Sequence, residues 1–307
     1  MPLFQKDYSS DEIAQLENTC DTKAMVKALQ HKDADTRLKA AAALGRMGGP
    51  EAIQALINSL ATDPMGSVRF FAAASLGKTA GKEAIPALTR ALDNHKDNVH
   101  QSAAQAIGEI ADKVRNPILF DEATRKLIIM LRADHEVREA SITALGKIRD
   151  PRAAQAVAAT MSKTFSKHQI RLATEALIRI GRPSVPYLRQ ILAQGEDLNA
   201  IAAALALGRI GDPAAAPTLI DALTHIHHEV RRQSVIALGR MRVRAAIPAM
   251  LKTLEDSDAP VRVAVANALG EMQAREAIGT LQSLATYDFQ ASVRAAAEAA
   301  LIRLGVE

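Results

Sequence analysis

The chain has 307 residues, of which 48% are hydrophobic and 3% aromatic, and its formal net charge is +4. This charge permits an acidic partner but falls short of the clustered basic surface of a dedicated nucleic-acid binder, so we do not expect nucleic-acid binding. A single cysteine, Cys20, excludes an internal disulfide framework and fits a reducing compartment. Residues 1–12 lack the apolar core of a signal peptide, and no segment approaches the ~20 apolar residues of a membrane span. We therefore expect a cytoplasmic protein.

The first elements of the chain differ from those that follow. Ser10 or Asp11 can cap a short helix, and Asp21 can cap a second one. Neither helix carries the sequence signature of the later elements. We interpret residues 1–32 as N-terminal capping helices, because the end of a repeat array needs a polar outer face.

A repeating unit follows, and it is clearest in residues 63–92, DPMGSVRFFAAASLGKTAGKEAIPALTRAL. Val-Arg precedes an alanine-rich helical turn and then Leu-Gly, and a second apolar helix commonly begins at proline. With Gly77 taken as the register position, the equivalent residues are Gly45, Gly77, Gly108, Gly146, Ile178, Gly208, Gly239, Gly270 and Ile302. They lie 30 to 38 residues apart, and periods in this range indicate a solenoid in which each unit packs against its neighbours.

Each unit has the apolar spacing of two helices. Val68, Ala72 and Leu76 share one face of the first helix, and Ile85 and Leu88 share one face of the second. No run alternates with period two for long enough to predict a strand. The abundant alanines allow the helix axes to approach at the short end of the usual ~8–10 Å.

Aspartates in the turns stand at a fixed distance from the arginines of the Val-Arg pattern. Asp63, Asp256 and Asp288 each precede an arginine by six residues, and these arginines are Arg69, Arg262 and Arg294. An aspartate in this place can cap the next helix and can pair with the arginine of its own or a neighbouring unit. We interpret the set as a structural ladder.

The longest step in the repeat results from extra residues at 111–122, ADKVRNPILFDE. Asn116-Pro117 should break any helix there, so we predict an irregular segment with regular helix pairs on either side. Ile118, Leu119 and Phe120 are apolar within this connection. They either pack back over the neighbouring helix pair or protrude as a contact loop.

These residues resemble the HEAT-repeat family, in the short bacterial and archaeal form first named from phycobilisome lyase subunits. The pattern D-x-x-x-x-V-R-x-x-A-A-x-A-L-G-x-I-G, followed by P-x-L-x-x-x-L, covers roughly residues 33–305. The resemblance implies an all-α fold, a right-handed α-solenoid of about nine helix pairs with terminal caps, in which residues 33–307 form one continuous domain. The family includes scaffolds, chromophore lyases and metal hydroxylases, so the fold does not decide the function.

The position after the register residue is basic in seven of nine units. We call this set the basic row: Arg46, Lys78, Glu109, Lys147, Arg179, Arg209, Arg240, Glu271 and Arg303. In the family that this chain resembles, the first helix of each pair lines the concave face, so the row suggests a site for an acidic surface, with Phe70, Ile201 and Ile236 as apolar anchors. The alternative is that these cations serve the helix ends, where the dipole favours them.

We find no catalytic constellation in the sequence. The HEAT-like di-iron hydroxylases use four His-Glu pairs inside helices, whereas this chain has two, His135-Glu136 and His228-Glu229, which we place in turns. His225, His227 and His228 are dense, but they lack supporting cysteines, so we expect neither a metal nor a cofactor. We expect a non-catalytic scaffold or adaptor that binds an acidic protein partner on its concave face. The alternative is a bilin or tetrapyrrole lyase subunit or chaperone, an enzyme class that the family resemblance alone suggests.

Overall fold

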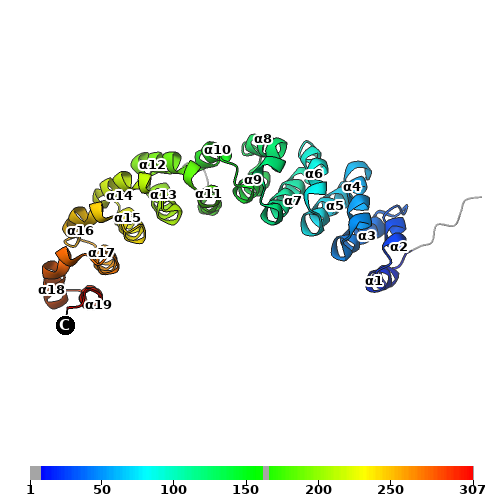
Figure 1. The fold of residues 1–307 in the computed structure, drawn as a ribbon. Coiled ribbons are helices and arrows are strands. Elements are labelled where there is room, and N and C mark those ends of the chain that lie inside the picture. Colours follow the sequence, from blue (N-terminus) through cyan, green and yellow to red (C-terminus); the bar gives the residue numbers. More distant parts are fainter. Residues whose placement is uncertain (1–7, 162–165, 307) are drawn as a thin grey trace, which may run out of the picture. The chain divides into compact units, whose positions relative to one another are not determined.

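A computed structural model describes residues 8–161 and 166–306, and all regular elements in these ranges are helices (Figure 1). The chain divides into two compact units, Met1–Val157 and Ala158–Glu307. Within each unit, helices alternate between two layers, which we call the first layer and the second layer. None of the described helices combines the length and apolar character that crossing a membrane requires.

In the first unit, each first-layer helix packs against the next first-layer helix, and the second layer covers one side of this row. The first layer consists of α1 (Ser10–Asn18), α3 (Ala34–Met47), α5 (Gly66–Thr79), α7 (Val99–Val114) and α9 (His135–Ile148). The second layer consists of α2 (Thr22–Ala28), α4 (Pro50–Thr62), α6 (Ile85–Ala91) and α8 (Asp121–Met130), and α10 (Ala153–Ala159) follows α9 at the boundary of the unit.

The second unit repeats this arrangement, and its first layer follows the inner side of the unit's own curve (Figure 1). The first layer consists of α11 (Lys167–Ile180), α13 (Asp197–Ile210), α15 (His228–Arg240), α17 (Ala259–Glu271) and α19 (Ala291–Arg303). The second layer consists of α12 (Val185–Gln194), α14 (Ala216–Asp221), α16 (Ile247–Thr253) and α18 (Ile278–Tyr287).

Short 3-10 turns lead into most second-layer helices, and one follows α14. They are η1 (Lys82–Ala84), η2 (Pro117–Phe120), η3 (Arg182–Ser184), η4 (Pro213–Ala215), η5 (Ala222–Thr224), η6 (Arg244–Ala246) and η7 (Arg275–Ala277). Proline occupies the first turn of α6, α12, α14 and α16, as the sequence predicts, because its missing N–H costs nothing there.

The register glycines allow successive first-layer helices to touch backbone to backbone. A Cβ on Gly77 would lie 2.7 Å from the Cα of Ala106 in α7, and one on Gly208 would lie 2.8 Å from the Cα of Ala237 in α15. Such distances leave no room for any side chain. The glycine at this position is therefore required by packing, and it fixes how closely the units stack.

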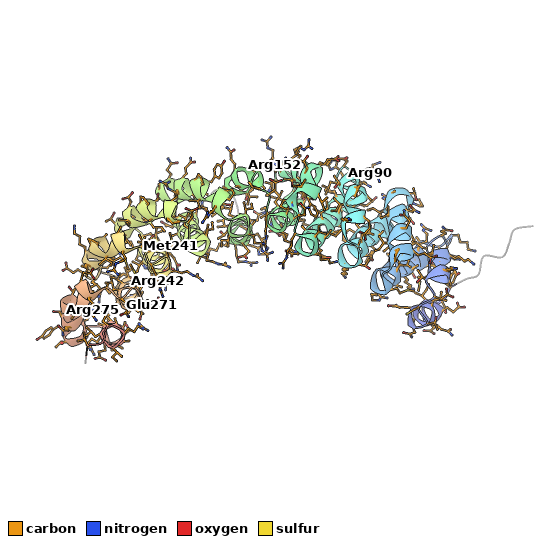
Figure 2. The ribbon with its side chains drawn as sticks, in the orientation of Figure 1. Arg90, Arg152, Met241, Arg242, Glu271 and Arg275 are labelled. Carbon is orange, nitrogen blue, oxygen red and sulfur yellow. The ribbon has the colours of Figure 1, made fainter. Side chains whose placement is uncertain are left out.

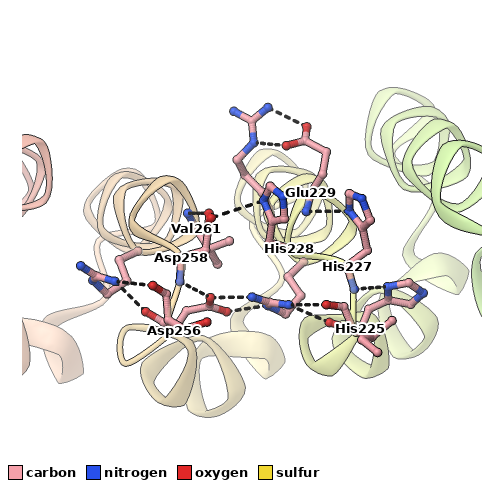
Figure 3. Close-up of polar contacts among 12 residues, drawn as sticks. His225, His227, His228, Glu229, Asp256, Asp258 and Val261 are labelled. Carbon is pink, nitrogen blue, oxygen red and sulfur yellow. Dashed lines mark hydrogen bonds and ion pairs between the residues drawn. The ribbon is translucent and has the colours of Figure 1, made fainter.

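The predicted arginine–aspartate ladder is confirmed at four places, and at each of them it joins one turn to the next. Arg231 donates from Nε and Nη2 to Asp256 at 2.6 and 2.7 Å, and its Nη1 donates to the carbonyls of His225 and Ile226 (Figure 3). Equivalent ion pairs join Arg37 to Asp63, Arg69 to Asp97 and Arg262 to Asp288. Each of these arginines thus ties its own turn to the turn of the following repeat.

The predicted irregular segment within 111–122 is confirmed for residues 115–120, while 111–114 still belong to α7 and 121–122 begin α8. Helix α7 ends at Val114, Arg115 has the left-handed φ of 49°, and η2 then leads into α8. Of the three apolar residues in this connection, Phe120 is buried and Ile118 is 82% exposed. The two alternatives therefore apply to different residues, because Phe120 packs into the core while Ile118 projects from it.

The predicted N-terminal cap at 1–32 is described only in part. Its residues 1–7 lie outside the described residues, and α1 and α2 form the remainder. Ser9 caps α1 with a complete capping box, and Asp21 caps α2, so the actual caps lie one residue before Ser10 and at the predicted Asp21. The boundary at residue 32 and the single continuous domain over 33–307 stay predictions.

Candidate binding groove

A groove runs between α11 and α13 in the second unit and has a volume of about 540 Å³. We call it the α11–α13 groove. Its lining residues are Lys167, Ile170, Arg171, Thr174, Glu175, Arg179, Leu198, Ile201, Ala202, Leu205 and Arg209. Both helices belong to the first layer, so the groove lies on the face that the second layer leaves uncovered.

The apolar part of the groove comes chiefly from α13. Leu198, Ile201 and Leu205 stand three and four residues apart and therefore share one face of this helix. Leu198 is 48% exposed and Leu205 is 40% exposed, while the opposite face of α13 buries Ala203 and Leu207 in the core. An otherwise apolar helix thus presents a second apolar stripe to solvent, which is unusual for a helix that only fills a core.

Charged side chains surround this stripe. Four of the lining residues are basic, Lys167, Arg171, Arg179 and Arg209, and one, Glu175, is acidic. The Oε2 of Glu175 accepts from Arg209 Nη1 at 2.9 Å, and its Oε1 lies 3.6 Å from Arg179 Nε. The excess of cations gives the groove a positive potential that favours carboxylates.

The groove coincides with a break in the glycine register. Ile178 of α11 stands at the register position, where Gly77 and Gly208 each admit the backbone of the next helix. A branched side chain does not permit that approach. We therefore attribute the opening between α11 and α13 to Ile178 together with the apolar residues that line it.

The structure brings three of the sequence-predicted site residues together in the second unit. Arg179, Ile201 and Arg209 all line the α11–α13 groove. Ile236 is 41% exposed, and Arg240, one turn later on α15, is also exposed, but neither lines the groove.

The other predicted site residues belong to the first unit. Phe70 is half-buried on α5 in edge-to-face contact with Phe71, with ring centroids 5.7 Å apart. Lys78 is exposed at the end of α5, and Lys147 of α9 forms an ion pair with Asp112 at 3.3 Å.

The seven basic members of the row all lie in the last turn of their helices, where the helix dipole favours a cation, as the alternative interpretation predicts. At the end of α5, the carbonyls of Gly77 and of the row residue Lys78 accept from Nζ of Lys113, which lies outside the row, at 2.8 Å for Gly77. Arg46 donates to Glu17 at 2.5 and 2.7 Å. Glu271, labelled in Figure 2, is exposed at the end of α17 and interrupts the row. Membership of the row therefore does not by itself make a residue part of a site.

Sequence reasoning missed Leu198, Leu205 and Glu175. The signal for the two leucines was present, because they are seven residues apart on one helical face. Glu175 stands four residues before Arg179, which is the ordinary spacing of a helical ion pair. Its second partner, Arg209, comes from the next repeat and depends on how α11 and α13 pack.

The histidines at the start of α15 form hydrogen bonds within the turn that precedes this helix. The Nδ1 of His225 accepts from the backbone N–H of His227 at 3.1 Å, and the Nδ1 of His227 accepts from that of Glu229 at 3.2 Å (Figure 3). His228 stacks on His227 with ring centroids 5.0 Å apart. Within residues 8–161 and 166–306, no three His, Cys, Asp or Glu side chains are grouped closely enough to hold a metal ion.

The two His-Glu pairs lie at helix starts and not in turns as expected. His135 is the first residue of α9, and His228 is the first residue of α15. The aspartate or histidine before each pair caps the helix: Asp134 accepts from Val137, and His227 accepts from Glu229. The expectation was wrong because α9 and α15 already begin at His135 and His228, ahead of the Val-Arg pattern.

The stacked helix pairs, the arginine ladder and the exposed first-layer groove define an α-solenoid repeat protein. A family model of HEAT repeats matches residues 12–69, 56–135, 157–234 and 220–302, and a model of the PBS lyase HEAT-like repeat matches residues 137–161. The chain therefore belongs to the HEAT-repeat family. No curated protein matches it in sequence.

Several solved structures share the fold. The chain is 15% identical to Kap121p bound to Nup53p, with a TM-score of 0.66, over 98% of this chain and 40% of that one. It is 15% identical to Kap95p in a complex with RanGDP, with a TM-score of 0.63, over 98% of this chain and 47% of that one. Human deoxyhypusine hydroxylase is 20% identical over 95% of this chain and 99% of its own, but its TM-score of 0.36 is too low to support a shared fold. The chain spans less than half the length of the two Kap proteins.

Proposed function

We propose that this protein is a non-catalytic binding solenoid whose α11–α13 groove receives an acidic segment of a partner protein. The observation that carries the proposal is the combination of exposed Leu198 and Leu205 with the guanidinium groups of Arg179 and Arg209. Apolar surface rimmed by charge is the usual anatomy of a protein-binding site. The charges steer a partner of opposite sign to it.

The chemistry of the groove defines the partner segment. Leucine-sized side chains would pack on the stripe of Leu198, Ile201 and Leu205, and glutamate or aspartate would meet the arginines. Kap121p, which shares the fold, is bound to Nup53p in one structure and to the C-terminus of Cdc14p in another. Those complexes are consistent with a solenoid of this kind holding a segment of another protein.

A bilin is the second candidate ligand. The match to the PBS lyase HEAT-like repeat favours it, and the propionates of a bilin could pair with arginines. That match, however, covers residues 137–161 in α9 and α10, and the groove lies in α11 and α13. We therefore place the protein partner first and use the absorbance spectrum of a bilin mixed with the protein to test the other candidate.

The test uses a short fluorescein-labelled peptide of alternating glutamates and leucines, which we call the Glu/Leu peptide. Its binding is measured by fluorescence anisotropy at low salt, for the wild type and for the double variant Arg179→Gln/Arg209→Gln. We expect the double variant to bind about tenfold more weakly, which corresponds to about 1.4 kcal/mol.

The matched control is Arg244→Gln. Arg244 is an exposed arginine of the same unit, paired with Glu276 at 3.4 Å, and it lies outside the groove. Its replacement should leave the affinity unchanged. Equal losses in the control and the double variant would show non-specific attraction and contradict the proposed site, as would failure of the wild type to bind.

A further inference from the structure

We infer that Glu175 is a specificity-determining residue of the groove, an internal carboxylate that a ligand carboxylate must displace. The inference rests on the proposed function. It concerns which partner segments the groove binds. The Glu175 carboxylate competes with the ligand for the arginines, so binding depends on how many negative charges the ligand carries.

The position of Glu175 is that of a bound carboxylate. It lies on α11, one turn before Arg179, and reaches across the groove to α13, where its Oε2 accepts from Arg209 Nη1 at 2.9 Å. Its Oε1 faces Arg179 Nε at 3.6 Å. The carboxylate thus lies between the two guanidinium groups that we assign to the ligand, and among the described lining residues no other carboxylate is present.

The exposure of these side chains allows the exchange. Glu175 is 43% exposed, Arg179 36% and Arg209 41%. Ion pairs this accessible to water contribute only ~0–1 kcal/mol, and a displaced Glu175 can be hydrated. In the ladder, by contrast, the Arg37 and Asp63 side chains are 9% and 5% exposed, so that pair is fixed.

Selectivity follows from this competition. A neutral apolar segment gains nothing at the arginines and leaves the Glu175 pair intact. A segment with several carboxylates displaces Glu175 and keeps contact with Lys167 and Arg171 at the same time. The groove should therefore discriminate between peptides that differ only in charge.

The experiment measures how the wild type, Glu175→Gln and Glu276→Gln bind two peptides. One is the Glu/Leu peptide, and the other, the glutamine peptide, has glutamine in place of every glutamate. Glu276 is the matched control, since it is an exposed carboxylate paired with an arginine of the same unit outside the groove. We expect Glu175→Gln to bind the Glu/Leu peptide about two- to fivefold more tightly, with a gain that shrinks as salt rises. The Glu175→Gln variant should bind the glutamine peptide with the affinity of the wild type. The Glu276→Gln variant should bind the Glu/Leu peptide with the affinity of the wild type.

A further variant separates competition from a structural role. Glu175→Asp keeps the charge but shortens the reach to Arg209. Its affinity for the Glu/Leu peptide should therefore lie between the affinities of the wild type and of Glu175→Gln. If Glu175→Gln binds as weakly as the wild type or more weakly, while Arg179→Gln/Arg209→Gln loses binding, Glu175 only orients the arginines; the inference is then wrong and the proposed function stands. If the wild type does not bind the peptide, both are wrong.

Discussion

Gly77 of α5 lies so close to Ala106 of α7 that an added Cβ would be 2.7 Å from the Ala106 Cα. We predict that Gly77→Val destabilises the protein by about 1–3 kcal/mol, because the side chain meets backbone that cannot yield. The control is Gly279→Ala, since no atom lies within 4 Å of its added Cβ. That change should be neutral or slightly stabilising. Denaturant unfolding gives both values, and similar effects for the two variants would show that the glycine register is not a packing requirement.

The buried rung of the ladder should be essential for stability. Arg37 donates from Nε and Nη2 to Asp63 at 2.8 and 3.1 Å. We predict that Arg37→Ala costs about 3–5 kcal/mol, because it leaves the Asp63 carboxylate buried without its partner. The exposed pair of Arg125 and Asp121 provides the comparison, and Arg125→Ala should cost less than about 1 kcal/mol. A loss at Arg37 no larger than that at Arg125 would disprove the structural role of the ladder.

Ladder carboxylates should make stability depend on pH. Arg262 donates to Asp288 at 2.8 and 2.9 Å and lowers the pKa of Asp288, although partial burial acts in the opposite direction. A carboxyl with a lowered folded-state pKa adds stability that is fully present above its unfolded-state pKa of about 3.9, and that is lost as pH falls through the folded-state pKa. Asp288→Asn should therefore be less stable than the wild type at about pH 6, with a smaller difference at about pH 3. A difference that does not change with pH would rule out this contribution.

Two leucines of α13 should respond differently to the same substitution. Leu207 is fully buried, so Leu207→Asp should cost several kcal/mol by burying a charge. Leu205 is 40% exposed in the groove, so Leu205→Asp should cost about 1 kcal/mol or less and weaken binding of the Glu/Leu peptide, because it removes apolar contact and adds a like charge. Thermal melting and anisotropy report the two effects. Equal destabilisation by both changes would mean that α13 does not present an apolar stripe to solvent.

The repeat architecture could be predicted because it depends on local patterns. The spacing of Val68, Ala72 and Leu76 predicts the first helix of a pair, and Asn116-Pro117 predicts where α7 ends. The spacing also predicts part of the ladder, since Asp63, Asp256 and Asp288 each stand six residues before an arginine. Their pairing with the arginine of the preceding repeat depends on how neighbouring units stack. These features need only the geometry of one unit and its neighbour.

The groove could be predicted only in part. Arg179 and Arg209 stand at the same position of the repeat as Lys78 and Arg240, yet they alone among these four line the α11–α13 groove. The difference depends on how α11 packs against α13, and Ile178 stands there at the position where other units have a glycine. Leu198 and Leu205 looked like core residues because α13 is apolar on nearly every face.

The most direct measurement of the central claim is hydrogen–deuterium exchange of the full chain with and without the Glu/Leu peptide. Bound peptide should slow amide exchange in α11 and α13, and the Arg179→Gln/Arg209→Gln variant should show no such protection. Protection confined to other helices, such as α5 with Lys78 or α9 with Lys147, would contradict the α11–α13 groove as the binding site. So would protection of α11 and α13 that persists in the double variant.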